Sequence, residues 1–114
     1  MPYTILGKDA MLDSLGVTHV SAHTADPGES GINEVSGGSY TRESISFSGS
    51  SGGNLDSSSQ PQISIPGDPT TVTHIGFWTA SSGGTLLGYK AIPSETFNND
   101  GTLTITDVNL DLNL

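Results

Sequence analysis

The sequence contains no cysteine, and only three of its 114 residues are basic. The absence of cysteine excludes disulfide bonds and thiol chemistry, and it removes the soft ligands that many zinc sites use. The three bases, Lys8, Arg42 and Lys90, stand against twelve acids, which gives a net charge of −9. Tracking of nucleic-acid phosphates needs clustered lysine and arginine, so direct binding of nucleic acid or of an anionic membrane is not expected. The acidic balance instead suits a basic protein partner.

Long hydrophobic runs are also missing. No apolar run approaches the roughly 18 residues that cross a membrane, and the first residues lack the basic and apolar regions of a secretion signal. We therefore expect a protein that is synthesised in a cytoplasm and inserts into no membrane.

Glycine, serine and threonine are abundant. The chain holds 15 glycines and 32% hydrophobic residues, and only 13% of its residues are charged. This composition does not suit a coiled coil or a helical bundle, and it is typical of an all-β domain with many turns. A length of 114 residues suits one domain, 1–114. We predict a small antiparallel β-sandwich, jelly-roll-like, with a short N-terminal α-helix.

The helix is predicted over about residues 5–15. Met11, Leu12 and Leu15 recur at helical spacing, and Gly16 stands where a helix-terminating glycine belongs. A helix of about three turns is not stable alone. Its apolar face is therefore expected to pack on the sheet or on another subunit.

Alternation of apolar and polar residues predicts the strands. In the stretch 62–66, Ile63 and Ile65 are expected to point inward. The stretch 17–23 has no strongly apolar face and is interpreted as an edge strand. The stretch 70–79 has large side chains on both faces, which favours a central strand. The strands are expected over residues 17–23, 40–48, 62–66, 70–79, 85–92 and 103–114.

Turn signals separate these strands. Pro93 is expected to interrupt the chain after the strand at 85–92, because proline lacks a backbone N–H. In the last strand the inward phase slips between Thr106 and Val108, which demands a bulge, a bend or a turn there. Glycine, proline and Asp-Gly signals predict a broad turn at 49–59, a tight turn at 66–69, and hairpin turns at 81–84 and 98–101.

The residues 24–39 form a long loop between two predicted strands. Loops longer than roughly 12–15 residues are uncommon in compact domains, and ordered ones are usually functional. Asp26-Pro27-Gly28 is a turn signal, and Glu34 and Arg42 are opposite charges near the ends of the second half. An ordinary surface loop and an ordered recognition loop for a partner protein both fit this pattern.

Two motifs carry a resemblance. The first is His23-Thr-Ala-Asp-Pro-Gly28, a short spacer, and then Asn33-Glu-Val-Ser-Gly-Gly-Ser-Tyr40-x-Arg42. The second is Thr73-His-Ile-Gly-Phe-Trp78 followed by Ala80-Ser-Ser-Gly-Gly-Thr-Leu-Leu-Gly88. Together they resemble a family of small tailed-bacteriophage virion proteins. Members are commonly labelled tail-fibre-like, and similar small proteins serve as capsid cement or decoration proteins.

No catalytic constellation is present. The sequence lacks a Gly-x-Ser-x-Gly motif at a strand-to-helix junction and a His-Glu-x-x-His motif. His19 and His23 share one face of a strand but would lie roughly 13 Å apart, too far to bind one ion. Asp100-Gly101 lacks the spacing of a calcium loop and is interpreted as a turn. We therefore expect a non-enzymatic protein without metal or cofactor.

Two functions fit the residues and the resemblance. The first is a capsid cement or decoration protein on the outside of the virion, bridging subunits of the major capsid protein. The alternative is a tail-fibre-like or tail appendage module that contacts tail proteins and contributes to host-surface attachment, through a receptor that is expected to be a glycan. The absence of repeats and of a heptad or collagen-like stalk favours cement. In either case we expect homo-oligomers in the virion and synthesis in the host cytoplasm.

The candidate contacts with the partner come from the loop, the predicted helix and the one tryptophan. Replacing Asp26, Pro27, Glu34 and Arg42 is expected to weaken partner binding more than it lowers the melting temperature. The full set of candidate residues is Met11, Leu12, Asp26, Pro27, Glu34, Tyr40, Arg42 and Trp78.

Overall fold

The computed structural model describes residues 16–48, 54–106 and 109–111. Within these residues the protein is all-β, every strand pair is antiparallel, and no helix occurs. The all-β class is therefore confirmed, whereas a jelly-roll order of strands is not established. The helix predicted over residues 5–15 lies outside the described residues.

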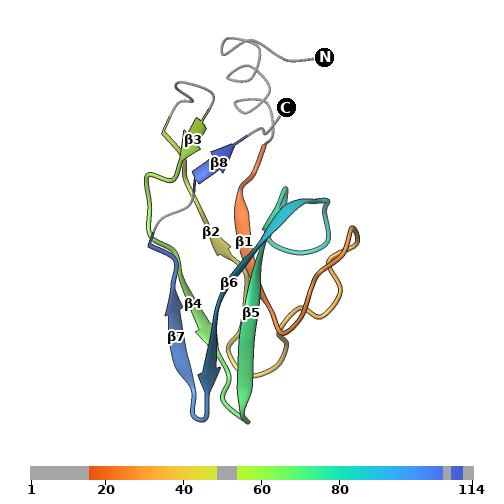
Figure 1. Ribbon diagram of the computed structural model, residues 1–114, viewed down its shortest axis with the longest axis vertical. Coiled ribbons are helices and arrows are strands. Elements are labelled where there is room, and N and C mark those ends of the chain that lie inside the picture. Colours follow the sequence, from red (N-terminus) through yellow and green to blue (C-terminus); the bar gives the residue numbers. More distant parts are fainter. Residues whose placement is uncertain (1–15, 49–53, 107–108, 112–114) are drawn as a thin grey trace.

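The strands form three sheets (Figure 1). The largest has four strands in the order β2-β1-β5-β6, and the other two are the pairs β3–β8 and β4–β7. The bounds are β1 His19–His23, β2 Glu43–Ser44, β3 Asn54–Asp56, β4 Gln62–Ile65, β5 Thr70–Trp78, β6 Leu86–Phe97, β7 Gly101–Thr104 and β8 Asn109–Asp111.

One apolar core joins the four-stranded sheet to the β4–β7 pair. Ile63 and Ile65 of β4 are buried, as their alternation predicts, and they share the core with Leu103 of β7. The four-stranded sheet contributes inward side chains from β1 and β5, among them Val20, Ala22, Val72, Ile75 and Phe77. The two sheets therefore turn their apolar faces toward each other, and β5 is a central strand as expected.

The interpretation of residues 17–23 as an edge strand is wrong. β1 lies between β2 and β5, with His19 opposite Trp78 and His23 opposite His74. Val20 and Ala22 face the core, while Ser21 and His23 on the other face are also fully buried. In the sequence β1 resembles an edge strand, because the polar residues Ser21 and His23 suggest a face exposed to solvent. In the structure this polar face is buried.

The predicted break at Pro93 is also wrong, since β6 continues through it. Val72 pairs with Glu95 and the next pair is His74 with Ala91, so residues 92–94 bulge opposite Thr73. A bulge on an edge strand needs no hydrogen bond from the proline nitrogen, which explains why Pro93 is tolerated.

Two further expectations about turns need correction. Part of the predicted broad turn at 49–59 is strand β3, which pairs with β8. The predicted last strand at 103–114 contains two strands with different partners, β7 on β4 and β8 on β3. The predicted single strand is interrupted, because β7 ends at Thr104 and β8 begins at Asn109. The predicted phase slip between Thr106 and Val108 falls on residues outside the described part of the chain.

The turn at 98–101 is not a hairpin turn. It carries the chain from β6, which pairs with β5, to β7, which pairs with β4. The turn between β4 and β5 makes the same change of sheet, and both turns lie at the lower end of Figure 1. They interlock there, because the Gly67 N–H donates to the Asp100 carboxylate at 3.0 Å and the Gly67 backbone packs against that of Asn99.

Replacing Gly67 with alanine is expected to lower the free energy of unfolding by about 1–3 kcal/mol. An added Cβ would overlap the backbone of Asn99, which cannot rotate away as a side chain can. Urea unfolding measures the loss. The matched control is Gly88→Ala in β6, where the nearest atom to an added Cβ lies 4.0 Å away. Equal stability of the two variants would contradict the interlocked turns.

Candidate functional site

The first half of the long loop closes on itself. At its base the Thr24 N–H donates to the Asn33 carbonyl at 3.0 Å, and the Val35 N–H donates to the Ala22 carbonyl at 2.9 Å. At its tip the Pro27 carbonyl accepts two backbone N–H groups at 3.0 Å, and the Asp26 carboxylate accepts the Gly28 N–H at 2.7 Å. Residues 24–34 are therefore held in place by internal hydrogen bonds, and a partner-binding role for the loop stays a prediction.

Glu34 and Arg42 form a two-pronged ion pair. Arg42 Nε lies 2.9 Å from Glu34 Oε2, and Arg42 Nη2 donates to Glu34 Oε1 at the same distance. The Tyr40 hydroxyl donates to Glu34 Oε2 at 2.7 Å and accepts the Ala22 N–H at 3.1 Å. These contacts join Glu34 in the loop to Tyr40 and Arg42, which follow the loop, and Tyr40 links them to strand β1.

Burial and hydrogen bonding shift the two acidic groups in opposite directions. Burial alone would raise the pKa of Glu34, but the hydrogen bonds from Arg42 and Tyr40 favour the carboxylate and lower it overall. Burial raises the pKa of Tyr40, and its bond to the Glu34 carboxylate raises it further, because the hydroxyl proton is needed there. The network therefore holds a charged glutamate and a neutral tyrosine.

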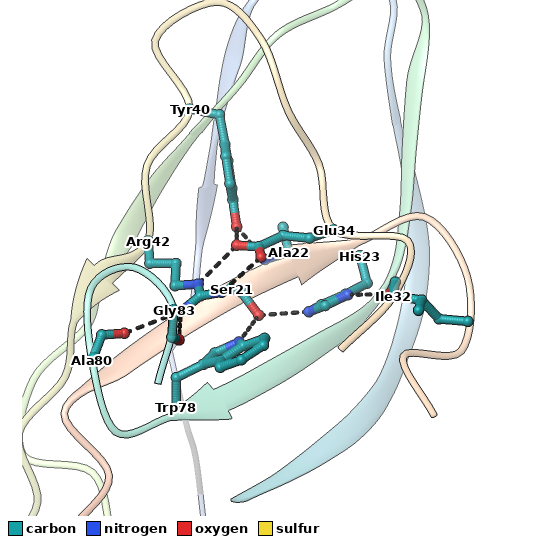
Figure 2. Close-up of polar contacts among 10 residues, drawn as sticks. All are labelled: Ser21, Ala22, His23, Ile32, Glu34, Tyr40, Arg42, Trp78, Ala80 and Gly83. Carbon is teal, nitrogen blue, oxygen red and sulfur yellow. Dashed lines mark hydrogen bonds and ion pairs between the residues drawn. The ribbon is translucent and has the colours of Figure 1, made fainter. Parts of the chain in front are cut away.

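Arg42 also binds the hairpin between β5 and β6 (Figure 2). Its Nη1 donates to the carbonyls of Ala80 at 3.2 Å and Gly83 at 2.9 Å. Its guanidinium carbon lies 3.5 Å from the centroid of the Trp78 ring, which is a cation–π contact. One arginine thus connects the loop, a β5 side chain and the hairpin turn.

A buried chain of hydrogen bonds continues from Trp78. The indole Nε1–H donates to Ser21 Oγ at 2.7 Å, and the Ser21 hydroxyl and His23 Nε2 are 2.6 Å apart. On the other side of the ring, His23 Nδ1 lies 2.9 Å from the Ile32 carbonyl. Since a carbonyl only accepts, Nδ1 carries the proton and Nε2 accepts from Ser21. His23 therefore fastens the loop to the sheet in its neutral form.

The serine–histidine contact is not arranged for catalysis. Ser21 and His23 are both 0% exposed, so no substrate reaches either group. Among the described residues, no group of three or more His, Cys, Asp or Glu side chains is placed to hold a metal ion. His19 and His74 instead contact the neighbouring hydroxyls of Thr18 and Thr73.

The structure brings together four of the eight candidate residues, Glu34, Tyr40, Arg42 and Trp78. Trp78 is only 5% exposed. Pro27 is buried and Asp26 is exposed, both in the loop. Met11 and Leu12 lie outside the described residues. The role of these eight residues as partner contacts stays a prediction.

Sequence reasoning missed Ser21, His23 and Gly31 as members of this network. Gly31 has φ +81° and lies directly against the indole of Trp78, where a side chain would collide with the ring. The backbone of the loop at Gly31 thus packs directly on the Trp78 ring. A signal for His23 existed, because it ends a strand where the long loop begins.

A sequence-family profile described as Podophage GP4 fiber I protein gp80 matches residues 7–113. The chain belongs to this family. The resemblance found in the two motifs is thereby confirmed, and the protein is a structural protein of the phage virion. The match spans the loop and every described strand. It also spans the contacts of Arg42 with Glu34, Trp78, Ala80 and Gly83, here called the Arg42 clamp. No curated protein sequence matches the chain significantly. The part of the chain that the structure describes contains no helix long and apolar enough to cross a membrane.

Acid is expected to destabilise the fold through His23. Burial lowers the pKa of His23 below its ordinary value of 6.5, against the raising effects of the Ile32 carbonyl and Glu34; Arg42 and His74 add to the lowering. The unfolded chain therefore binds the proton more readily, and stability falls as the pH drops below 6.5. Melting temperatures measured from pH 8 to about pH 5 test this expectation.

The control for this pH dependence is His23→Gln, which can bond Ser21 and Ile32 but does not titrate. At neutral pH its melting temperature is expected to be lower than that of wild type. Below pH 6.5 it is expected to lack the fall in melting temperature that His23 causes in wild type. The lowered pKa of Glu34 adds a separate loss of stability, which starts only below 4.5. A wild-type melting temperature that stays flat down to pH 5 would contradict the role given to His23.

Proposed function

We propose that the chain is a fibre-type appendage module of the virion, which acts through protein–protein contacts and catalyses no reaction. The observation that carries the proposal is the fibre I family match over residues 7–113, which covers nearly the whole chain. The fibre module replaces capsid cement as the favoured function, since the matching family is described as a fibre protein.

The internal contacts support a module that keeps its shape. Arg42 bonds to Glu34, Ala80 and Gly83 and stacks on Trp78, so one side chain holds together two segments that are far apart in sequence, the loop region and the end of β5 with its hairpin turn. The polar groups that could do chemistry, Ser21 and His23, are buried and bonded to each other. Such cross-connections suit a structural part, whereas an enzyme needs reactive groups that a substrate can reach.

The number of copies per particle tests the proposal. Quantitative mass spectrometry of purified virions, with the major capsid protein as internal reference, is expected to give at most a few tens of copies. Immunogold labelling is expected to place them at the tail. Hundreds of copies in a fixed ratio to capsid subunits would overturn the proposal and establish the cement function. Assembly of the copies into homo-oligomers stays a prediction.

A further inference from the structure

Three large apolar side chains are exposed, one in the long loop and two at the start of strand β6. They are Ile32, Leu87 and Tyr89, with exposed fractions of 59%, 38% and 45%. Tyr89 lies opposite Gly76 in the register, and its ring meets the edge of the His74 ring at a centroid distance of 6.2 Å. A soluble surface normally scatters such side chains singly, and gathering them marks an interaction site.

Contacts inside the protein place Ile32 in the same neighbourhood. His74, which contacts Tyr89, pairs across the sheet with His23. His23 in turn binds the Ile32 carbonyl through Nδ1. The loop tip and the first half of β6 are therefore neighbours on the outer face, away from the apolar core.

A hollow of about 300 Å³ lies between the loop tip and β6. Its lining has little side-chain bulk at Gly28 and Gly88, which leaves room for a partner between larger groups. The remaining lining residues are Glu29, Leu86, Leu87 and Tyr89.

The charge on this face has one sign. Glu29 is an exposed acid in the hollow, and exposed Asp26 belongs to the same loop. Lys90 follows Tyr89 directly, so its side chain points to the opposite face of the strand, where it lines a separate groove with Ile75. Among the described residues, none that lines the hollow is basic. The patch is thus apolar and aromatic with an acidic rim, on a chain of net charge −9.

We propose that Ile32, Leu87, Tyr89 and Glu29, here called the Tyr89 surface, dock an apolar segment that carries lysine or arginine on a neighbouring virion protein. The proposal rests on the proposed fibre function and names the chemistry of the partner. The apolar part of the segment covers Leu87 and Ile32, and its cation pairs with Glu29 and the face of the Tyr89 ring. A bare phosphate or nucleic acid is disfavoured by the same charges.

Peptide titration tests the chemistry of the Tyr89 surface. The probe is the acetylated, amidated peptide Lys-Leu-Lys-Leu-Lys, added to the ¹⁵N-labelled full chain and followed by NMR. Shifts are expected at the amides of residues 28–32 and 86–89, and they are expected to vanish in Glu29→Lys. The matched control is Glu95→Lys, an exposed acid on β6 outside the hollow with the same change in net charge. Equal shifts with Glu-Leu-Glu-Leu-Glu, or unchanged shifts in Glu29→Lys, would overturn the proposal.

Particle assembly tests the biological role. Particles are produced with Glu29→Lys, Leu87→Ser, Tyr89→Ser or Glu95→Lys as the only source of the protein, after the melting temperature of each variant is measured. We expect the first three variants to be incorporated at least tenfold less than wild type, and Glu95→Lys at the wild-type level. Wild-type incorporation of the first three would overturn the proposal, and so would full incorporation with reduced adsorption to the host, which would assign the surface to a receptor. The readout is a ratio of variant to wild type, so it is independent of the wild-type copy number that tests the fibre function.

Discussion

Arg42→Ala is expected to lower the free energy of unfolding by about 3 kcal/mol, the lower end of the range for breaking a buried ion pair by removing one partner, because Glu34 keeps some contact with solvent. The Arg42 side chain is 8% exposed, and its loss would leave the partly buried Glu34 carboxylate, whose side chain is 22% exposed, with only the Tyr40 hydroxyl for compensation. The carbonyls of Ala80 and Gly83 would lose their donor at the same time. Urea unfolding followed by the fluorescence of Trp78, the one tryptophan, measures the effect directly at the stacked ring.

Arg42→Lys is the informative control. It keeps the charge but cannot reach both Glu34 oxygens and two carbonyls together, because an ammonium lacks the planar fork of the guanidinium. We expect it to recover less than half of the lost stability. A double-mutant cycle with Glu34→Gln then isolates the ion pair from the contacts with the hairpin and the indole. An Arg42→Ala variant as stable as wild type would mean that the clamp contributes little to the fold.

This prediction changes the expected outcome of the loop substitutions. From the sequence, Asp26, Pro27, Glu34 and Arg42 are expected to matter more for partner binding than for stability. The contacts of Glu34 and Arg42 inside the chain lead us to expect the opposite order for these two. Asp26 is exposed, so for it the original expectation stands as a prediction.

Gly31→Ala is expected to lower the free energy of unfolding by about 2–5 kcal/mol. Two separate penalties act: the left-handed backbone conformation, which costs other residues about 1–2 kcal/mol, and overpacking, which costs about 1–3 kcal/mol. Gly31 has φ +81°, and an added Cβ would overlap Cη2 and Cζ2 of Trp78. The ring cannot shift freely, since Arg42 stacks on it and Ser21 binds its nitrogen.

Gly28→Ala separates the two penalties. Gly28 belongs to the same loop with φ +62°, but an added Cβ there would meet nothing within 4 Å. The free energy of unfolding of Gly28→Ala is expected to fall only by the cost of the left-handed backbone conformation, about 1–2 kcal/mol. The difference between the two variants in urea unfolding then measures the packing of the loop on the indole. A difference near zero would show that the loop yields to the added methyl group.

Several local features follow from the sequence because local chemistry is sufficient for them. Alternation of Ile63 and Ile65 predicts the buried face of β4, since side chains alternate along any strand. Gly83 and Gly84 predict the reversal between β5 and β6, and both have positive φ in the structure. The opposite charges of Glu34 and Arg42 single out the pair that the structure joins.

The pairing of strands could not be obtained in this way. The Asn98–Gly101 segment signals a reversal, but the signal is the same whether the chain returns within one sheet or crosses to the other. Here the interlocking of Gly67 with Asn99 and Asp100, more than thirty residues away in sequence, accompanies the crossing. The continuation of β6 through Pro93 likewise depends on a bulge opposite Thr73, which belongs to another strand.

The sequence by itself determined the all-β class, the positions of most turns, the acidic character and, through two motifs, the phage family. Only the tertiary structure decided which strands pair, that Ser21, His23 and Trp78 form a buried polar chain, and that Arg42 clamps the loop to the hairpin. The physical reason is range. Turn propensity and alternation act within a few residues, whereas the burial of a polar face on β1 depends on a loop that folds back over it.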